Sequence, residues 1–124
     1  MDKDLLKQSQ TLLHIGNIDE IKNFIPLLVA EFEKLDYEAS KIEIDYDLYR
    51  IERYEYWKKK KKLGEIQRTE KEIEMESKKD ALKEFWDKLL WKKVAQHYRL
   101  NIEQLSQRKI DLQVENKSMR EAWL

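Results

Sequence analysis

Apolar residues recur every three or four positions over a long stretch of the chain, from Ile18 to Leu63. A period of about 3.5 residues, sustained over so many turns, is typical of a helix that packs along a seam. The seam positions are Ile18, Ile21, Ile25, Leu28, Phe32, Leu35, Ala39, Ile42, Tyr46, Tyr49, Arg53, Tyr56, Lys60 and Leu63, of which the first ten are apolar. We therefore predict a long helix over residues 17–63.

Glycine and capping residues predict where this helix begins. Gly16 ends a short amphipathic helix over residues 1–16, because glycine readily adopts the left-handed conformation that closes a helix. Asn17 can then cap the long helix, with Glu20 at the third helical position. Pro26 lacks an amide donor and crowds the preceding turn, so we predict a kink near this residue.

A second long helix is expected after a turn over residues 64–69. Thr69 and Glu72 form a capping box for it, and neither glycine nor proline occurs after the turn. The simplest interpretation is one helix over residues 70–123. A break near Asn101 is the alternative, because asparagine can also cap a new helix.

Charge favours antiparallel pairing of the two long helices. With the turn at residues 64–69, residues 31–55 lie opposite residues 77–101. The first window holds nine acids and four bases, whereas the second holds seven bases and three acids. Opposite charges on facing flanks favour this pairing. We predict an all-α fold in a single domain over residues 1–124. A short N-terminal helix precedes a long, coiled-coil-like antiparallel hairpin, which self-association completes into a bundle.

A second apolar stripe lies on the opposite face of the first long helix. Its members are Leu27, Ala30, Tyr37, Ile44, Leu48 and Ile51. A helix in a hairpin needs only one apolar face, so a second face implies a second neighbour. That neighbour is either a third helix of the same chain or another molecule, as in a homodimer or a complex with a partner protein. If Tyr37, Ile44, Leu48 and Ile51 had neither a helix nor another chain against them, the main argument for a binding function would be lost.

The second long helix is apolar over a wide arc between Ala81 and Tyr98. The arc contains Leu82, Phe85, Trp86, Leu89, Leu90, Trp91, Val94, Ala95 and Tyr98. The segment from Trp86 to Arg99 is also basic, and such amphipathic helices can bind anionic membranes or the groove of a partner. Because its arc continues the hairpin core, we expect burial instead.

Composition narrows the classes of function. Of 124 residues, 40% are charged, and acids balance bases at a net charge of +0. No global field therefore attracts nucleic acid or a membrane. The chain has no cysteine, its N-terminus does not resemble a signal peptide, and its aliphatic runs are too short to span a bilayer. We expect a cytoplasmic protein that does not bind membranes.

A basic and aromatic segment is the most suggestive local feature. Its members are Arg50, Arg53, Tyr54, Trp57, Lys58, Lys59, Lys60, Lys61 and Lys62. Lysines can neutralise phosphates while aromatic rings stack on unpaired bases, a combination suited to single-stranded nucleic acid. Pairing with glutamates across the hairpin, or plain solvation, is the favoured explanation of the lysines. These glutamates are Glu70, Glu72, Glu74 and Glu76.

Patterns typical of catalytic or metal sites do not occur in the sequence. The histidines are His14 and His97, and neither belongs to a Glu-x-x-His or His-x-x-x-His pair. There is no glycine-rich loop for a phosphate and no nucleophile elbow. We therefore expect no enzyme, no cofactor, no metal and no small-molecule substrate.

The sequence thus favours a helical interaction module that forms a homodimer. It would bind a protein or nucleoprotein partner through Tyr37, Ile44, Leu48 and Ile51. Such a chain could serve as an accessory or inhibitor protein, and it resembles small accessory proteins, including phage-encoded ones, in its charge density alone. The first alternative is a single-strand nucleic-acid-binding accessory factor that uses residues 50–62. The second is a structural oligomer without another partner.

Overall fold

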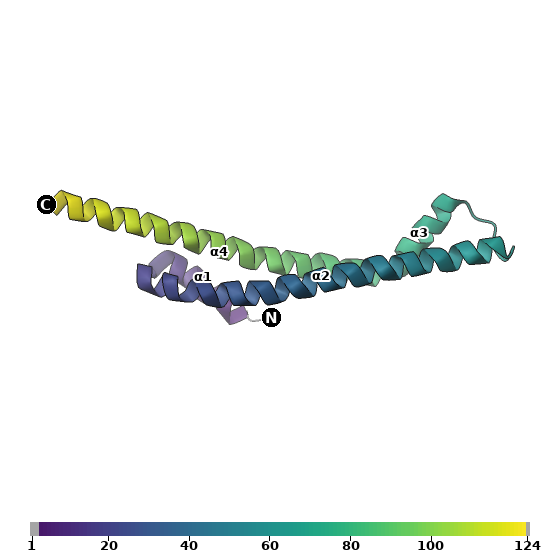
Figure 1. Cartoon of the computed structure of the whole chain (residues 1–124), viewed down its shortest axis with the longest axis horizontal. Coiled ribbons are helices and arrows are strands. Elements are labelled where there is room, and N and C mark those ends of the chain that lie inside the picture. Colours follow the sequence, from purple (N-terminus) through teal and green to yellow (C-terminus); the bar gives the residue numbers. More distant parts are fainter. Residues whose placement is uncertain (1–2, 124) are drawn as a thin grey trace. The chain divides into compact units, whose positions relative to one another are not determined.

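Four helices account for nearly all of residues 3–123, the part of the chain that the computed structural model describes (Figure 1). They are α1 (Lys3–Ile15), α2 (Ile18–Lys62), α3 (Glu70–Asp80) and α4 (Leu82–Trp123). No strand occurs within residues 3–123. The predicted all-α fold class is confirmed.

The chain divides into two compact units, each of which contains part of α2 and part of α4. The first unit comprises residues 1–36 and 93–124, and the second comprises residues 37–92. Within the second unit, Lys92 Nζ lies 2.9 Å from Glu43 Oε1, and Arg53 Nε lies 2.9 Å from Asp80 Oδ2. Later residues of α2 thus face earlier residues of the returning chain, as in an antiparallel hairpin. The prediction of a single domain stays a prediction.

The predicted seam of α2 lies on its buried side over most of its length. Ile21, Leu28 and Leu35 are buried in the first unit, and Ala39 and Tyr46 are buried in the second. Beyond Arg53 the seam opens to solvent, where Tyr56 and Leu63 are exposed. The apolar period of about 3.5 residues therefore correctly predicted which side of α2 packs against the rest of the chain.

The turn between α1 and α2 is closed by hydrogen bonds from its capping residue. Asn17 Oδ1 accepts from the Glu20 amide at 2.9 Å, and Asn17 Nδ2 donates to the Glu20 carboxylate at 2.6 Å. The prediction of a left-handed Gly16 is wrong, because in the described chain only Gly64 has a positive φ, of 77°. Gly16 is needed for another reason. A Cβ at this position would lie 2.6 Å from the Leu12 carbonyl oxygen, closer than a side chain can approach.

Pro26 lies inside α2, which continues through it as one helix from Ile18 to Lys62. The proline cannot bond the carbonyl of Lys22. Both residues are exposed, so water can satisfy that carbonyl. The long helix is confirmed by its observed bounds, and the kink near Pro26 stays a prediction.

The prediction of one continuous helix over residues 70–123 is wrong, because Ala81 separates α3 from α4. Ala81 has φ −96° and ψ 18°, and its amide donates to the carbonyls of Ser77 and Lys79. Its side chain is fully buried. In Figure 1, α3 is inclined to the first turns of α4. One residue in the bridge region of backbone space suffices for this break, and that conformation requires neither glycine nor proline.

The alternative prediction of a break near Asn101 is wrong, because α4 continues through this residue. Asn101 instead joins α4 to α1. Its side-chain oxygen accepts from Ser9 Oγ at 2.9 Å and from Gln10 Nε2 at 2.7 Å, while its Nδ2 donates to the His97 carbonyl at 2.8 Å. Ser9 is 1% exposed. A buried hydroxyl needs such a partner, so Asn101 sets where α1 packs.

We expect Asn101→Ala to lower the free energy of unfolding by about 1–3 kcal/mol, because it leaves the Ser9 hydroxyl buried without its acceptor. The double variant Ser9→Ala with Asn101→Leu should recover much of this loss, since no buried polar group then lacks a partner. Urea denaturation measures both. The control is Asn116→Ala, which replaces an exposed asparagine of the same helix. Equal losses in Asn101→Ala and Asn116→Ala would contradict the role of the buried contact.

Candidate functional site

The second stripe of α2 is exposed in the unit formed by residues 37–92. The exposed fractions are 69% for Tyr37, 59% for Ile44, 61% for Leu48 and 51% for Ile51. Ala39 and Tyr46, on the other side of the same helix, are buried. A third helix of the described chain was one expected cover for the stripe, and for these four residues that expectation is wrong. We call these four side chains the α2 face.

A second exposed apolar face lies on the first turns of α4. Leu82, Trp86, Leu89 and Leu90 are each between 40% and 60% exposed, and we call them the α4 face. The expectation that the whole arc from Ala81 to Tyr98 is buried is therefore wrong for these four. The inner residues of the arc are Phe85 and Trp91, half-buried in this unit, with Ala95 and Tyr98 buried in the other. One packing neighbour covers only one side of a helix.

Asp80 links the end of α3 to the basic and aromatic segment of α2. Its Oδ2 accepts from Trp57 Nε1 at 2.7 Å and from Arg53 Nε at 2.9 Å. Burial opposes ionisation of this carboxyl, but the hydrogen bonds from Trp57 and Arg53 outweigh it and hold the pKa of Asp80 below its usual value. The hydrogen bond to Asp80 likewise raises the pKa of Arg53. Both side chains are about three-quarters buried.

Cations of the chain itself cover the aromatic rings of this segment. The Arg53 guanidinium lies 4.2 Å from the centroid of the Tyr56 ring, and Lys60 Nζ lies 4.8 Å from it. The guanidinium of Arg68 lies 5.3 Å from the centroid of the Trp57 ring. These are cation–π contacts within one unit. A base that stacks on the face of Tyr56 or Trp57 occupied by these cations would have to displace them.

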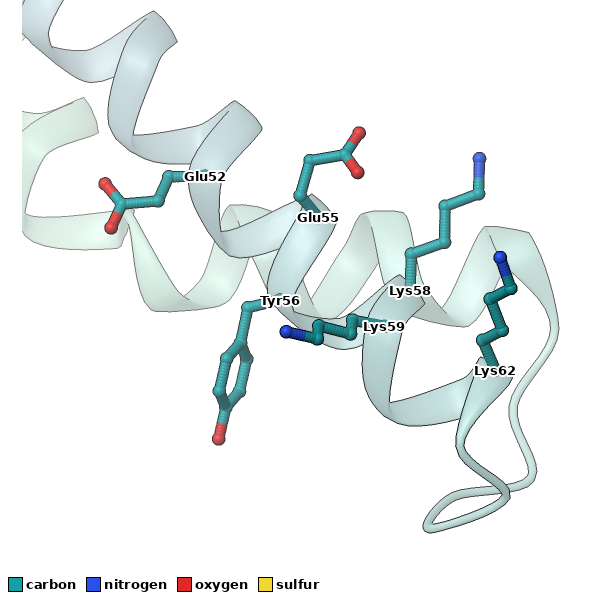
Figure 2. Close-up of a pocket in the computed structure, with 6 residues that line it drawn as sticks. All are labelled: Glu52, Glu55, Tyr56, Lys58, Lys59 and Lys62. Atoms are coloured by element: carbon teal, nitrogen blue, oxygen red, sulfur yellow. The ribbon is translucent and has the colours of Figure 1, made fainter.

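The lysines at the end of α2 are largely exposed. Lys58, Lys59 and Lys62 line a shallow groove together with Tyr56, and Glu52 and Glu55 stand at its other end (Figure 2). Lys60 is half-buried against Tyr56, and a hydrogen bond with this tyrosine raises the pKa of Lys60.

The glutamates of α3 do not form ion pairs with these lysines. Within residues 3–123, the ion pair that α3 makes near the turn is Glu76 with Arg68, at 3.0 Å. Pairing of Lys58–Lys62 with Glu70, Glu72, Glu74 and Glu76, one of the two explanations that the sequence left open, is therefore not observed in the described chain. Solvation remains as the simple explanation of the lysine run.

Sequence reasoning missed Asp80, although a signal was present. Residues equally distant from the centre of a hairpin turn face each other, and Arg53 and Asp80 are such a pair around residues 66–67. Pairing opposite charges across the turn would have found this contact. The same rule places Glu43 opposite Leu90, two residues before its observed partner Lys92.

Within residues 3–123, no group of three or more histidines and carboxylates is placed to hold a metal. No helix in that range has the length and hydropathy that crossing a membrane requires. Comparisons of the chain with protein-family models, with curated proteins and with solved structures found no match.

We expect Asp80→Asn to lower the free energy of unfolding at pH 7 by about 1–3 kcal/mol, because two hydrogen bonds lose their charged acceptor. The pKa of Asp80 is lowered by folding, so its contribution is fully present above the ordinary carboxyl pKa of about 4 and disappears as pH falls through the folded value. The difference between the variant and the parent chain should therefore shrink from pH 7 to pH 3.

Urea denaturation over this pH range measures that difference. Asp87→Asn is the matched control, since Asp87 is an exposed aspartate of the same unit. A constant difference over the range, or an equal loss in Asp87→Asn, would show that the charge on Asp80 does not stabilise the fold.

Proposed function

We propose that this chain is a non-enzymatic helical interaction module, an accessory or inhibitor protein that binds a protein or nucleoprotein partner through the α2 face. No helix of the described chain covers Tyr37, Ile44, Leu48 and Ile51, so the proposal requires a second molecule to cover them. The observation that carries it is their exposure, each more than half open to solvent on one side of one helix. Apolar patches of this kind are typical of protein-binding surfaces.

The energetics of burial favour a protein as the partner. Covering a large apolar side chain contributes about 1.5–3 kcal/mol relative to leaving it exposed. Ile44, Leu48 and Ile51 lie on consecutive turns of α2, and Tyr37 lies two turns before Ile44 on the same side. A partner helix could therefore contact all four with its own apolar face. Binding by a helix in a groove or along a seam uses anchors with this spacing.

A second candidate function is binding of single-stranded nucleic acid by residues 50–62. It is favoured by the exposure of Lys58, Lys59, Lys61 and Lys62 together with the lack of ion pairs to α3 within the described chain. Two observations weigh against it. Glu52 and Glu55 share the groove with the lysines, and the rings of Tyr56 and Trp57 already face cations of the chain.

The first test replaces Ile44 and Leu48 by lysine in one variant. We expect this variant to lose self-association and partner capture, because two charges then stand on the apolar face. Its helicity should be unchanged, because lysine at position 48 can pair with Glu52 one turn later. Light scattering gives the mass, capture from an extract of the native source gives partner binding, and circular dichroism gives helicity.

The control for this test is Leu63→Lys with Met75→Lys, which makes the same chemical change at two residues that are each 64% exposed and lie outside the α2 face. Mass and capture that are unchanged in the Ile44 and Leu48 variant would reject the α2 face as an interface.

The second test replaces Lys58–Lys62 by glutamine and measures the gel shift of a single-stranded oligonucleotide at several salt concentrations. If the segment contacts phosphates, the parent chain should bind more weakly as salt rises, and the variant should not bind. The control replaces five other lysines by glutamine, Lys71, Lys78, Lys79, Lys83 and Lys93, all of them exposed. Equal binding by both variants, or no shift with the parent chain, would reject this candidate function.

A further inference from the structure

Two apolar faces of the unit formed by residues 37–92 are uncovered, and their residue spacings match. On α2, Ile44, Leu48 and Ile51 follow each other at intervals of four and three residues. On α4, Leu82, Trp86 and Leu89 follow each other at the same intervals. Equal spacing lets the side chains of two helices meet layer by layer along a shared seam.

The exposed charges around the two faces have opposite signs. Between Tyr37 and Glu55 the exposed charged residues are Asp45, Glu52 and Glu55 against Lys41. Near the α4 face they are Lys83 and Lys92 of α4, with Lys78 and Lys79 at the end of α3, against Asp87. The α2 face thus has an acidic border and the α4 face a basic one, although Lys92 also bonds Glu43 of its own chain.

We infer that the partner that covers the α2 face is a second copy of this chain, which presents its α4 face. The inference rests on the proposed function and names the partner that function requires. Charge complementarity selects this pairing. Two α2 faces together would place acids against acids, and two α4 faces would place lysines against lysines, whereas the mixed pairing places opposite charges together.

The chain carries both halves of this interface, and each half lies on the side of its helix turned away from the seam between α2 and α4. The contact is therefore heterologous: the α2 face of one copy binds the α4 face of the next, and association continues from head to tail. Each contact then covers the four side chains of one copy's α2 face and the four side chains of the other copy's α4 face. This accounts for both uncovered faces with one kind of molecule.

Engineered cysteines test the inference directly, because the chain has none of its own. Leu48 and Trp86 are the middle residues of the two matched triplets, so they oppose each other whether the two helices run parallel or antiparallel. Leu48→Cys and Trp86→Cys are prepared as separate proteins, one of them with a tag that changes its mass. They are then mixed and treated with a short bismaleimide.

The mixture should give a cross-linked product that contains both variants, whereas each variant alone should give little. Mixing Leu63→Cys with Trp86→Cys is the control, since Leu63 is equally exposed but lies outside the α2 face. Stronger cross-linking by Leu48→Cys alone than by the mixture would overturn the inference in favour of an α2–α2 contact. A monomeric parent chain at about 100 µM, far above the Kd of a specific contact between copies, would also overturn it.

A charge exchange separates this inference from the proposed function. Lys79→Glu with Lys83→Glu should raise the Kd of the contact between copies about tenfold or more through like charges. Adding Asp45→Lys with Glu52→Lys should restore it. Loss of association in the Ile44 and Leu48 variant, with none in Trp86→Lys with Leu90→Lys, would overturn the inference but keep the α2 face as an interface. A chain that stays monomeric but captures another protein through the α2 face would also overturn the inference and keep the α2 face as an interface.

Discussion

A helix that packs against a single neighbour can bury only one of its sides, and this constraint shapes the unit formed by residues 37–92. Tyr46 is 8% exposed, whereas Ile44, two residues earlier on the same helix, is 59% exposed. The difference follows from helical geometry, because residues two apart point about 200° apart around the axis. The hairpin uses the inner side of α2 for its own stability. The apolar residues on the outer side add nothing to the isolated chain, so their burial contributes free energy only when another molecule arrives.

Polar contacts decide how the helices are placed along each other, since apolar contacts alone tolerate sliding. In the unit of residues 37–92, Asp80 accepts hydrogen bonds from Arg53 and Trp57, which fixes the end of α3 against one turn of α2. In the other unit, Asn101 does the same for α1 by accepting from Ser9. Each contact lies next to buried apolar residues, so a shifted register would leave a charge or a hydroxyl without a partner. That penalty is larger than the net gain from making the bond.

Much of the fold could be predicted from the sequence, because helix period and turn residues are local signals. The long helix, the turn after Gly64 and the caps at Asn17 and Thr69 are examples. The break at Ala81 could not, since its backbone conformation is open to any residue. Nor could the exposure of Trp86 and Leu90. An apolar side chain such as Trp86 is more stable when buried. Whether it is buried depends on how many helices pack around it, and the local sequence does not give that number. The sequence favoured a helix that continues through Asn101, as observed, and left a cap there as the alternative. It could not show that this side chain bonds a neighbouring helix.

The two candidate surfaces of α2 differ in what binding would disturb. A base that stacks on Tyr56 or Trp57 could contribute about 1–3 kcal/mol, but it would first displace cations, each contact worth about 0.5–1 kcal/mol at an exposed site. Trp57 is also held by its hydrogen bond to Asp80. Nucleic acid would therefore gain little from the rings and would depend on the lysines, next to two glutamates. The α2 face has no such competitors in the described chain. Its apolar side chains are already on one side of a formed helix, so a protein partner would bind there without rearranging the hairpin.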